Sequence, residues 1–98
     1  MSISAIPLSG LKASMTRLTA NASNVANAQS TGYAPVRATQ PEIMGGGVAT
    51  RIEPSGAAEV DLTDEMVGML VAKMDFQGNA KMLETIHNLD RRVLETLG

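Results

Sequence analysis

The chain contains no cysteine and no tryptophan, and it has only one phenylalanine and one tyrosine among its 98 residues. Without cysteine, neither a disulfide nor a thiolate-based catalytic or metal site is available. With so few aromatic residues, the core must be built from Met, Leu, Ile, Val and Ala, and the seven methionines make adaptable packing surfaces. A chain of this length forms at most one small domain, which buries a limited share of its surface.

Acidic residues are absent from the first 41 positions, whereas residues 60–98 carry seven acids against four bases. The net charge of −2 and the lack of a basic, aromatic-rich cluster argue against a nucleic-acid partner. No run of 18 apolar residues is present to span a membrane. An acid-free start is also typical of an organelle transit peptide, but pairing between a basic front helix and an acidic back helix is the simpler explanation.

Residues 60–98 lack proline and repeat their apolar residues at helical spacing, which predicts one helix about 55 Å long. The apolar residues form two rows, Leu62, Met66, Met69, Phe76, Ala80, Leu83, Leu94, Leu97 and Val67, Leu70, Met74, Met82, Ile86, Leu89, Val93. A surface helix needs only one apolar stripe, so two rows indicate neighbours on more than one side. A single broad stripe facing the core of a small bundle is the alternative.

Residues 4–28 are predicted to form the first helix, with Ser4 as a cap and Pro7 tolerated in the first turn. Its apolar residues alternate three and four apart: Leu8, Leu11, Met15, Leu18, Ala22, Val25. This heptad seam is typical of coiled-coil pairing with another helix. The helix is followed by Gly32, which can adopt the left-handed conformation that ends a helix.

The face opposite that seam carries Arg17, Asn21, Asn24 and Asn27. Asparagine is a poor helix former, so this run lowers the helical propensity of the segment. It either marks a fraying last turn or forms a ladder of side-chain amides that bond to a neighbouring helix or loop. The spacing alone leaves both interpretations open.

Residues 33–59 hold three of the four prolines and five of the nine glycines, which indicates a connector. Two segments with weak strand character, 36–44 and 48–53, flank the glycines at 45–47 and predict a small hairpin. The long helix then begins with either Asp61 or Thr63 as its cap. Gly68 and Gly78 lie in its interior, where a close contact with another helix would account for them.

No constellation for catalysis, for a cofactor or for a metal ion is evident. His87 and Asp90 lie three residues apart on the predicted helix, without a nucleophile or ligand spacing beside them, so a solvated pair is the better interpretation. The glycines at 45–47 lack the Lys-Ser/Thr and the helix start of a phosphate-binding loop. We therefore predict that the chain is not an enzyme.

Motifs at the two ends of the chain resemble those of the axial proteins of the bacterial flagellum, the rod and hook family. The N-terminal motif comprises Ser9-Gly10-Leu11, Leu18, Asn24-Val25-Ala26-Asn27 and Ser30-Thr31-Gly32-Tyr33. The C-terminal motif comprises Val60-Asp61-Leu62-Thr63, Glu65-Met66-Val67, Phe76-Gln77-Gly78-Asn79-Ala80-Lys81 and Thr85. The connector is short for this family, so the chain most resembles a proximal rod protein of minimal size.

The resemblance implies a structural subunit of the basal-body rod that polymerises through its terminal helices into a tube crossing the periplasm. It implies as partners further copies of the chain, other rod subunits, the flagellar type III export apparatus, and export-gate or ring proteins. It also implies export without a cleaved signal peptide. A soluble helical adaptor or export chaperone, which would use the methionine-rich faces to hold a partner, is the alternative.

The predicted fold is mainly α, with terminal helices in segments 1–32 and 60–98 paired as an antiparallel, coiled-coil-like hairpin. Segment 33–59 is predicted to be an irregular or β-hairpin connector. Leu8, Leu11, Met15, Leu18 and Val25 are expected to pack against Leu62, Met66, Met69, Phe76 and Leu83. The residues expected to fix the helix end against neighbours are Asn24, Asn27, Thr31, Gly32 and Tyr33, with Asn79 in the C-terminal motif.

Overall fold

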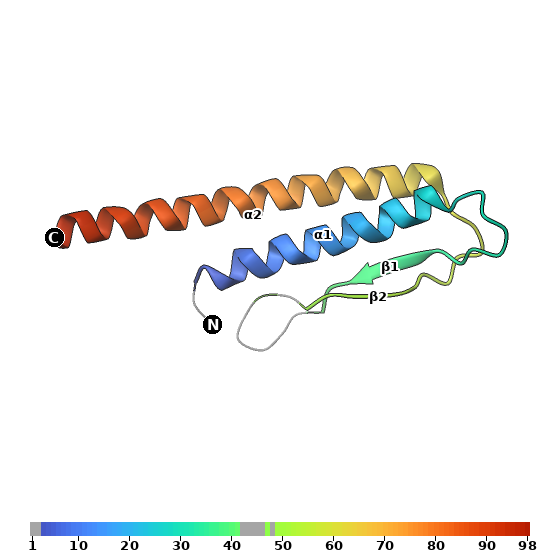
Figure 1. Ribbon diagram of the computed structural model, residues 1–98, viewed down its shortest axis with the longest axis horizontal. Coiled ribbons are helices and arrows are strands. Elements are labelled where there is room, and N and C mark those ends of the chain that lie inside the picture. Colours follow the sequence, from blue (N-terminus) through green and yellow to red (C-terminus); the bar gives the residue numbers. More distant parts are fainter. Residues whose placement is uncertain (1–2, 42–46, 48) are drawn as a thin grey trace.

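Two antiparallel helices and a two-stranded sheet make up the computed structural model, which describes residues 3–41, 47 and 49–98. Helix α1 spans Ala5–Ala26 and helix α2 spans Leu62–Leu97. In Figure 1, α1 runs alongside the first part of α2, and the C-terminal part of α2 projects well beyond the start of α1. This confirms the predicted helical hairpin with a short β connector.

Strands β1 (Val36–Thr39) and β2 (Arg51–Pro54) form the connector, paired antiparallel with Val36 opposite Pro54 and Thr39 opposite Arg51. The predicted hairpin is therefore present, with shorter strands than the sequence indicated. Residues 42–46 and 48, which include two of the predicted glycines, lie outside the described residues. The sheet packs against α1, on a face of that helix other than the one that meets α2 (Figure 1).

The helix ends follow local chemistry. Ser4 occupies the N-cap position of α1, but its side chain makes no capping hydrogen bond. Helix α1 ends two residues earlier than expected, and the chain leaves it through turns to Gly32, whose φ of 76° is the left-handed conformation that glycine favours. Asp61, rather than Thr63, caps α2, because its Oδ1 accepts a hydrogen bond of 3.2 Å from the backbone N–H of Asp64.

The core differs from the one expected. Among the described residues, the buried hydrophobic side chains are alanines at 13, 20 and 72, and the largest fully buried side chains are Asn24 and Pro7. Two helices and one hairpin form a body only 14 Å thick and 63 Å long, which cannot surround a large side chain. The Leu, Ile, Val and Met residues of the two helices are consequently left half-buried or exposed.

Candidate functional site

Asn24 joins three elements at the closed end of the helical hairpin. Its Nδ2 donates hydrogen bonds to the carbonyl of Val36 (2.7 Å) and to Oε1 of Glu65 (2.8 Å). Its Oδ1 accepts from the Tyr33 hydroxyl (2.7 Å) and from the backbone N–H of Val36 (3.0 Å). The side chain is 1% exposed, and these four bonds use its full hydrogen-bonding capacity. Asn24 therefore fixes the end of α1 to the start of β1 and to the first turns of α2.

The other predicted residues of this end contribute locally. Tyr33 also contacts Ser23 Oγ at 3.2 Å, so its ring is held against α1. Asn27 donates from Nδ2 to the carbonyl of Ser23 (2.9 Å), which lies one turn earlier in the same helix. Thr31 and Gly32 are exposed in the turn that follows. The amide ladder considered from the sequence is thus centred on Asn24, whereas Asn27 bonds within its own helix.

Glu65 is the member of this junction whose role sequence analysis missed. Its Oε1 accepts the hydrogen bond from Asn24, while its Oε2 is buried without a hydrogen-bond partner among the described residues. A carboxylate oxygen held away from water in this way carries a desolvation cost, which makes the Asn24 bond important for the site. The local sequence indicated only an acid in the first turn of a helix, where the helix dipole favours it.

The line along which α1 meets α2 is made of small and polar residues. A Cβ placed on Gly10 would lie 2.5 Å from Oδ1 of Asn79, and one placed on Gly68 would lie 2.7 Å from Nδ2 of Asn21. Only glycine therefore lets the two backbones approach so closely. An ion pair between Arg17 and Asp75 (2.6 Å) bridges the helices between these two points.

We call this line the seam: Gly10, Ser14, Arg17, Asn21, Asn24 on α1 and Glu65, Gly68, Ala72, Asp75, Asn79 on α2. Both sets follow the alternating three- and four-residue spacing of a heptad repeat. The contact pairs Gly10–Asn79, Asn21–Gly68 and Asn24–Glu65 all fit one antiparallel register.

The predicted apolar residues lie one residue after the seam on each helix. Leu11 follows Gly10 and Leu18 follows Arg17, while Met69 follows Gly68 and Phe76 follows Asp75. One residue turns the side chain by about 100° around a helix, so these residues flank the seam instead of filling it. In two antiparallel right-handed helices, a step of one residue in each chain leads to the same side of the pair. We call the resulting two-helix apolar surface the flank.

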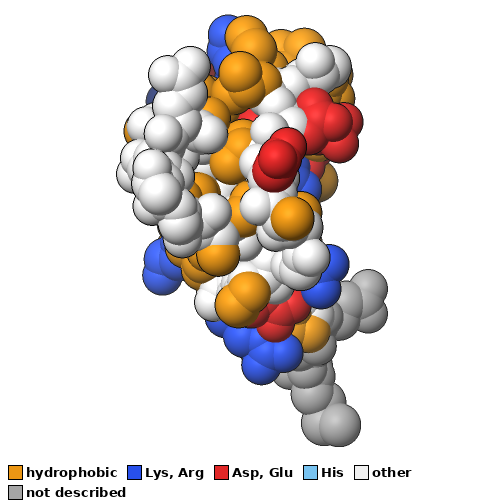
Figure 2. Space-filling model, turned by 90° about the vertical axis from the view of Figure 1, so that its right-hand side faces the viewer, with side chains coloured by type: hydrophobic (Ala, Val, Ile, Leu, Met, Phe, Trp, Pro, Cys, Tyr) orange, Lys and Arg blue, Asp and Glu red, His pale blue; other side chains and the backbone are white. Residues whose placement is uncertain are grey.

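Exposure divides the predicted packing residues into two groups. Leu11, Leu18, Val25, Met69 and Leu83 are half-buried beside the seam. Leu8, Met15, Leu62, Met66 and Phe76 are exposed, with Met66 64% accessible. Figure 2, which views the molecule from the closed end of the hairpin, shows hydrophobic side chains at the surface next to acidic and basic ones. The flank is therefore largely uncovered in a single copy of the chain.

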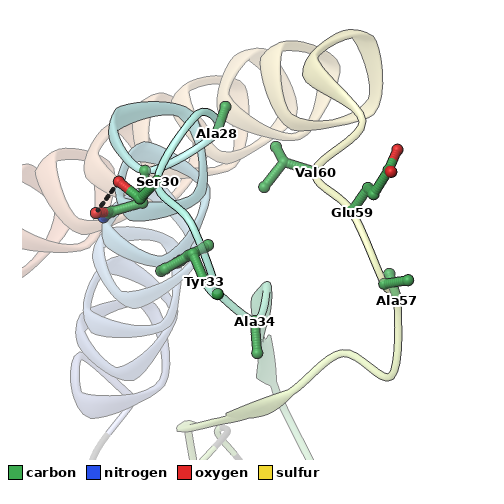
Figure 3. Close-up of a pocket in the computed structure, with 10 residues that line it drawn as sticks. Ala28, Ser30, Tyr33, Ala34, Ala57, Glu59 and Val60 are labelled. Atoms are coloured by element: carbon green, nitrogen blue, oxygen red, sulfur yellow. Dashed lines mark hydrogen bonds between the residues drawn. The ribbon is translucent and has the colours of Figure 1, made fainter.

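A hollow of about 550 Å³ lies at the closed end, between the turn after α1 and the segment before α2. In Figure 3, Val60 points toward this hollow, Tyr33 turns back toward α1, and the Glu59 carboxylate points away. The residues that line it are mainly alanines and small polar side chains, without a paired acid and base or a nucleophile. In the described part of the chain no group of three or more His, Asp or Glu residues could hold a metal ion.

His87 is exposed on the projecting part of α2, as expected for a solvated residue. Neither helix in the described ranges is both long and apolar enough to cross a membrane. Gly78 has open space where a Cβ would lie, unlike Gly68, so only one of the two predicted helix-contact glycines makes such a contact.

The contrast between these two glycines gives a direct test of the seam. Gly68→Leu should destabilise the fold by about 2 kcal/mol, because the new side chain must displace Asn21 and separate the helices. Gly78→Leu should be neutral or slightly stabilising, because it fills open space and raises helix propensity. Thermal unfolding followed by circular dichroism compares the two, and equal midpoints would show that the helices do not meet at Gly68.

Comparison with known proteins agrees with the C-terminal motif. Residues 57–96 match a family model described as the C-terminal region of flagellar basal body rod FlgEFG proteins. No curated protein matches the chain. The matched segment contains all of α2 except its last residue, together with the turn that leads into it. The resemblance to the flagellar rod and axial family is thus confirmed over this segment.

Proposed function

We propose that this chain, a protein of the flagellar basal-body rod family, is a structural subunit that polymerises through its two helices into the rod. The family is a structural component of the flagellar basal body. The observation that carries the proposal is the uncovered flank, which runs along both helices and exposes Leu8, Met15, Leu62 and Met66. Monomeric soluble proteins rarely leave such a contiguous apolar surface open, and it is typical of a site for another protein.

The division of labour between the seam and the flank supports the same proposal. Small and polar residues hold the two helices of one copy together, so the large apolar residues remain available for neighbouring molecules. A contact between different surfaces of identical copies repeats without closing and generates a helical filament. The proposed neighbours are further copies of the chain and other rod subunits.

Export through the flagellar type III apparatus is the proposed route to the rod. The chain has no cysteine and its buried hydrophobic residues are alanines, so little has to be undone for it to pass unfolded through a narrow channel. We propose that it is exported without a cleaved signal peptide and occupies the part of the rod that crosses the periplasm. Export-gate and ring proteins are further proposed neighbours.

Mass spectrometry of detergent-extracted basal bodies tests the subunit role. We expect the intact chain to co-purify with the rod, and a chain truncated by residues 91–98 to be missing from it, since that segment carries exposed Val93, Leu94 and Leu97. The truncated chain should remain in the cytoplasm at a normal level, which controls for degradation. If the intact chain stays wholly cytoplasmic in motile cells, it is instead a soluble adaptor or export chaperone.

A further inference from the structure

The α2 side of the seam changes character where α1 ends. Opposite α1 it carries Glu65, Gly68, Ala72, Asp75 and Asn79. The same three- and four-residue spacing then continues as large apolar residues: Met82, Ile86, Leu89, Val93. Helix α1 begins at Ala5, which the seam register places level with about residue 84 of α2. Leu89 and Val93 are consequently 59% and 48% exposed.

A second exposed apolar row of the same spacing lies on α1. It comprises Leu8, Leu11, Met15 and Leu18, and it covers about the same helical length as the distal apolar residues of α2. Leu8 is 45% exposed and Met15 is 50% exposed. This row belongs to the flank and lies level with the middle of α2, so it cannot reach the distal residues of its own copy. The two rows can meet only between copies.

We propose that the α1 row of one copy packs against Met82, Ile86, Leu89 and Val93 of a second copy, in an antiparallel helix pair. This assignment rests on the proposed rod-subunit function and names its contact surface. The spacing allows one register, in which Leu8 meets Val93, Met15 meets Ile86 and Leu18 meets Met82. Large apolar residues then face one another along both helices, as in a coiled-coil seam.

Charge complementarity favours the same partner and the same register. The α1 row lies in a segment without any acidic residue, and Lys12 stands exposed at one edge of it. Asp90 stands exposed at the edge of the distal α2 row. Both residues are rotated in the same sense from their rows, so an antiparallel pair brings them to the same side, and the register sets them level with each other. An ion pair across the contact rim follows.

The pairing has a consequence for the assembly. Since α1 runs antiparallel to α2 both within a copy and between copies, all copies point in the same direction. The new register differs from that of the seam by about 12 residues, which displaces each copy by about 18 Å along the helix axis. The two surfaces differ, so each copy still offers one of them to the next, and the contact propagates.

Disulfide cross-linking of the full-length chain tests the register, because the chain has no cysteine to give a background. Leu8→Cys and Val93→Cys are placed in separate chains, which are purified, mixed and oxidised. The proposal predicts a heterodimer yield several-fold above that of Leu8→Cys mixed with Arg91→Cys, whose side chain points to the other side of α2. Equal yields, or a higher yield for the control pair, would overturn it.

A charge exchange provides a second measurement that does not depend on oxidation. Lys12→Glu should weaken self-association in sedimentation experiments by about two- to fivefold, the range expected for an exposed ion pair. Adding Asp90→Lys to Lys12→Glu should restore it, while circular dichroism confirms that each variant is folded. An unchanged affinity in Lys12→Glu, or a double variant no better than the single one, would contradict the pairing.

Failure of this contact is distinguishable from failure of the subunit role. If both cysteine variants co-purify with basal bodies but give no Leu8–Val93 cross-link there, this pairing is wrong and the subunit role stands. If the unaltered chain is missing from basal bodies, the proposed function itself is wrong.

Discussion

An Asn24→Ala variant is expected to lose about 3 kcal/mol of folding free energy, which for a domain of this size lowers the melting temperature by roughly 15 °C. The substitution removes four hydrogen bonds at once. It leaves the backbone of Val36 and the half-buried carboxylate of Glu65 with unsatisfied polar atoms, and that desolvation cost exceeds the mean value of a hydrogen bond. Thermal and denaturant unfolding by circular dichroism measure the loss.

Asn27→Ala is the matched control, because Asn27 also belongs to the asparagine run but bonds to its own helix. It should cost less than about 1 kcal/mol. Asn24→Asp keeps the acceptor for Tyr33 but sets a carboxylate against Glu65, so it should also be strongly destabilised. Adding Glu65→Gln supplies a donor again and should recover part of the loss. If Asn24→Ala and Asn27→Ala unfold at the same temperature, the junction does not hold the fold together.

Much of the architecture was predictable from the sequence, since it follows from local rules. The apolar spacing of residues 60–98, the caps and the absence of proline predicted α2 to within a few residues of its ends. The proline- and glycine-rich segment predicted the connector and its hairpin. Asn24 and Tyr33 were singled out together by the N-terminal motif, and they bond directly.

The rotation of each helix about its axis was not predictable in the same way. A heptad of apolar residues normally faces the partner helix, yet here Gly10 and Gly68 allow a closer approach one residue earlier, and the apolar residues turn to the flank. Sequence analysis measures the apolar period but not which side is covered within one copy. In a subunit built for assembly, the largest apolar residues serve contacts that lie outside the chain. For the same reason, the role of Glu65 emerged only once α1 and α2 were placed side by side.

A Met66→Lys variant is expected to fold normally and yet fail to enter the rod. Met66 is 64% exposed, so a lysine there stays in water in the isolated chain and changes its stability by about 0.5 kcal/mol or less. In a packed assembly the same position would bury an unpaired charge, which costs several kcal/mol and abolishes incorporation. Gln77→Lys adds the same charge at an exposed polar position of α2 and serves as the matched control.

The most direct test of the central claim is the amount of each variant in purified basal bodies, measured by quantitative mass spectrometry against the unaltered chain in the same cells. The account predicts that Gln77→Lys is incorporated as well as the unaltered chain, and that Met66→Lys is absent although circular dichroism shows it folded. Incorporation of Met66→Lys at the level of the control would contradict the claim that the flank is the assembly surface.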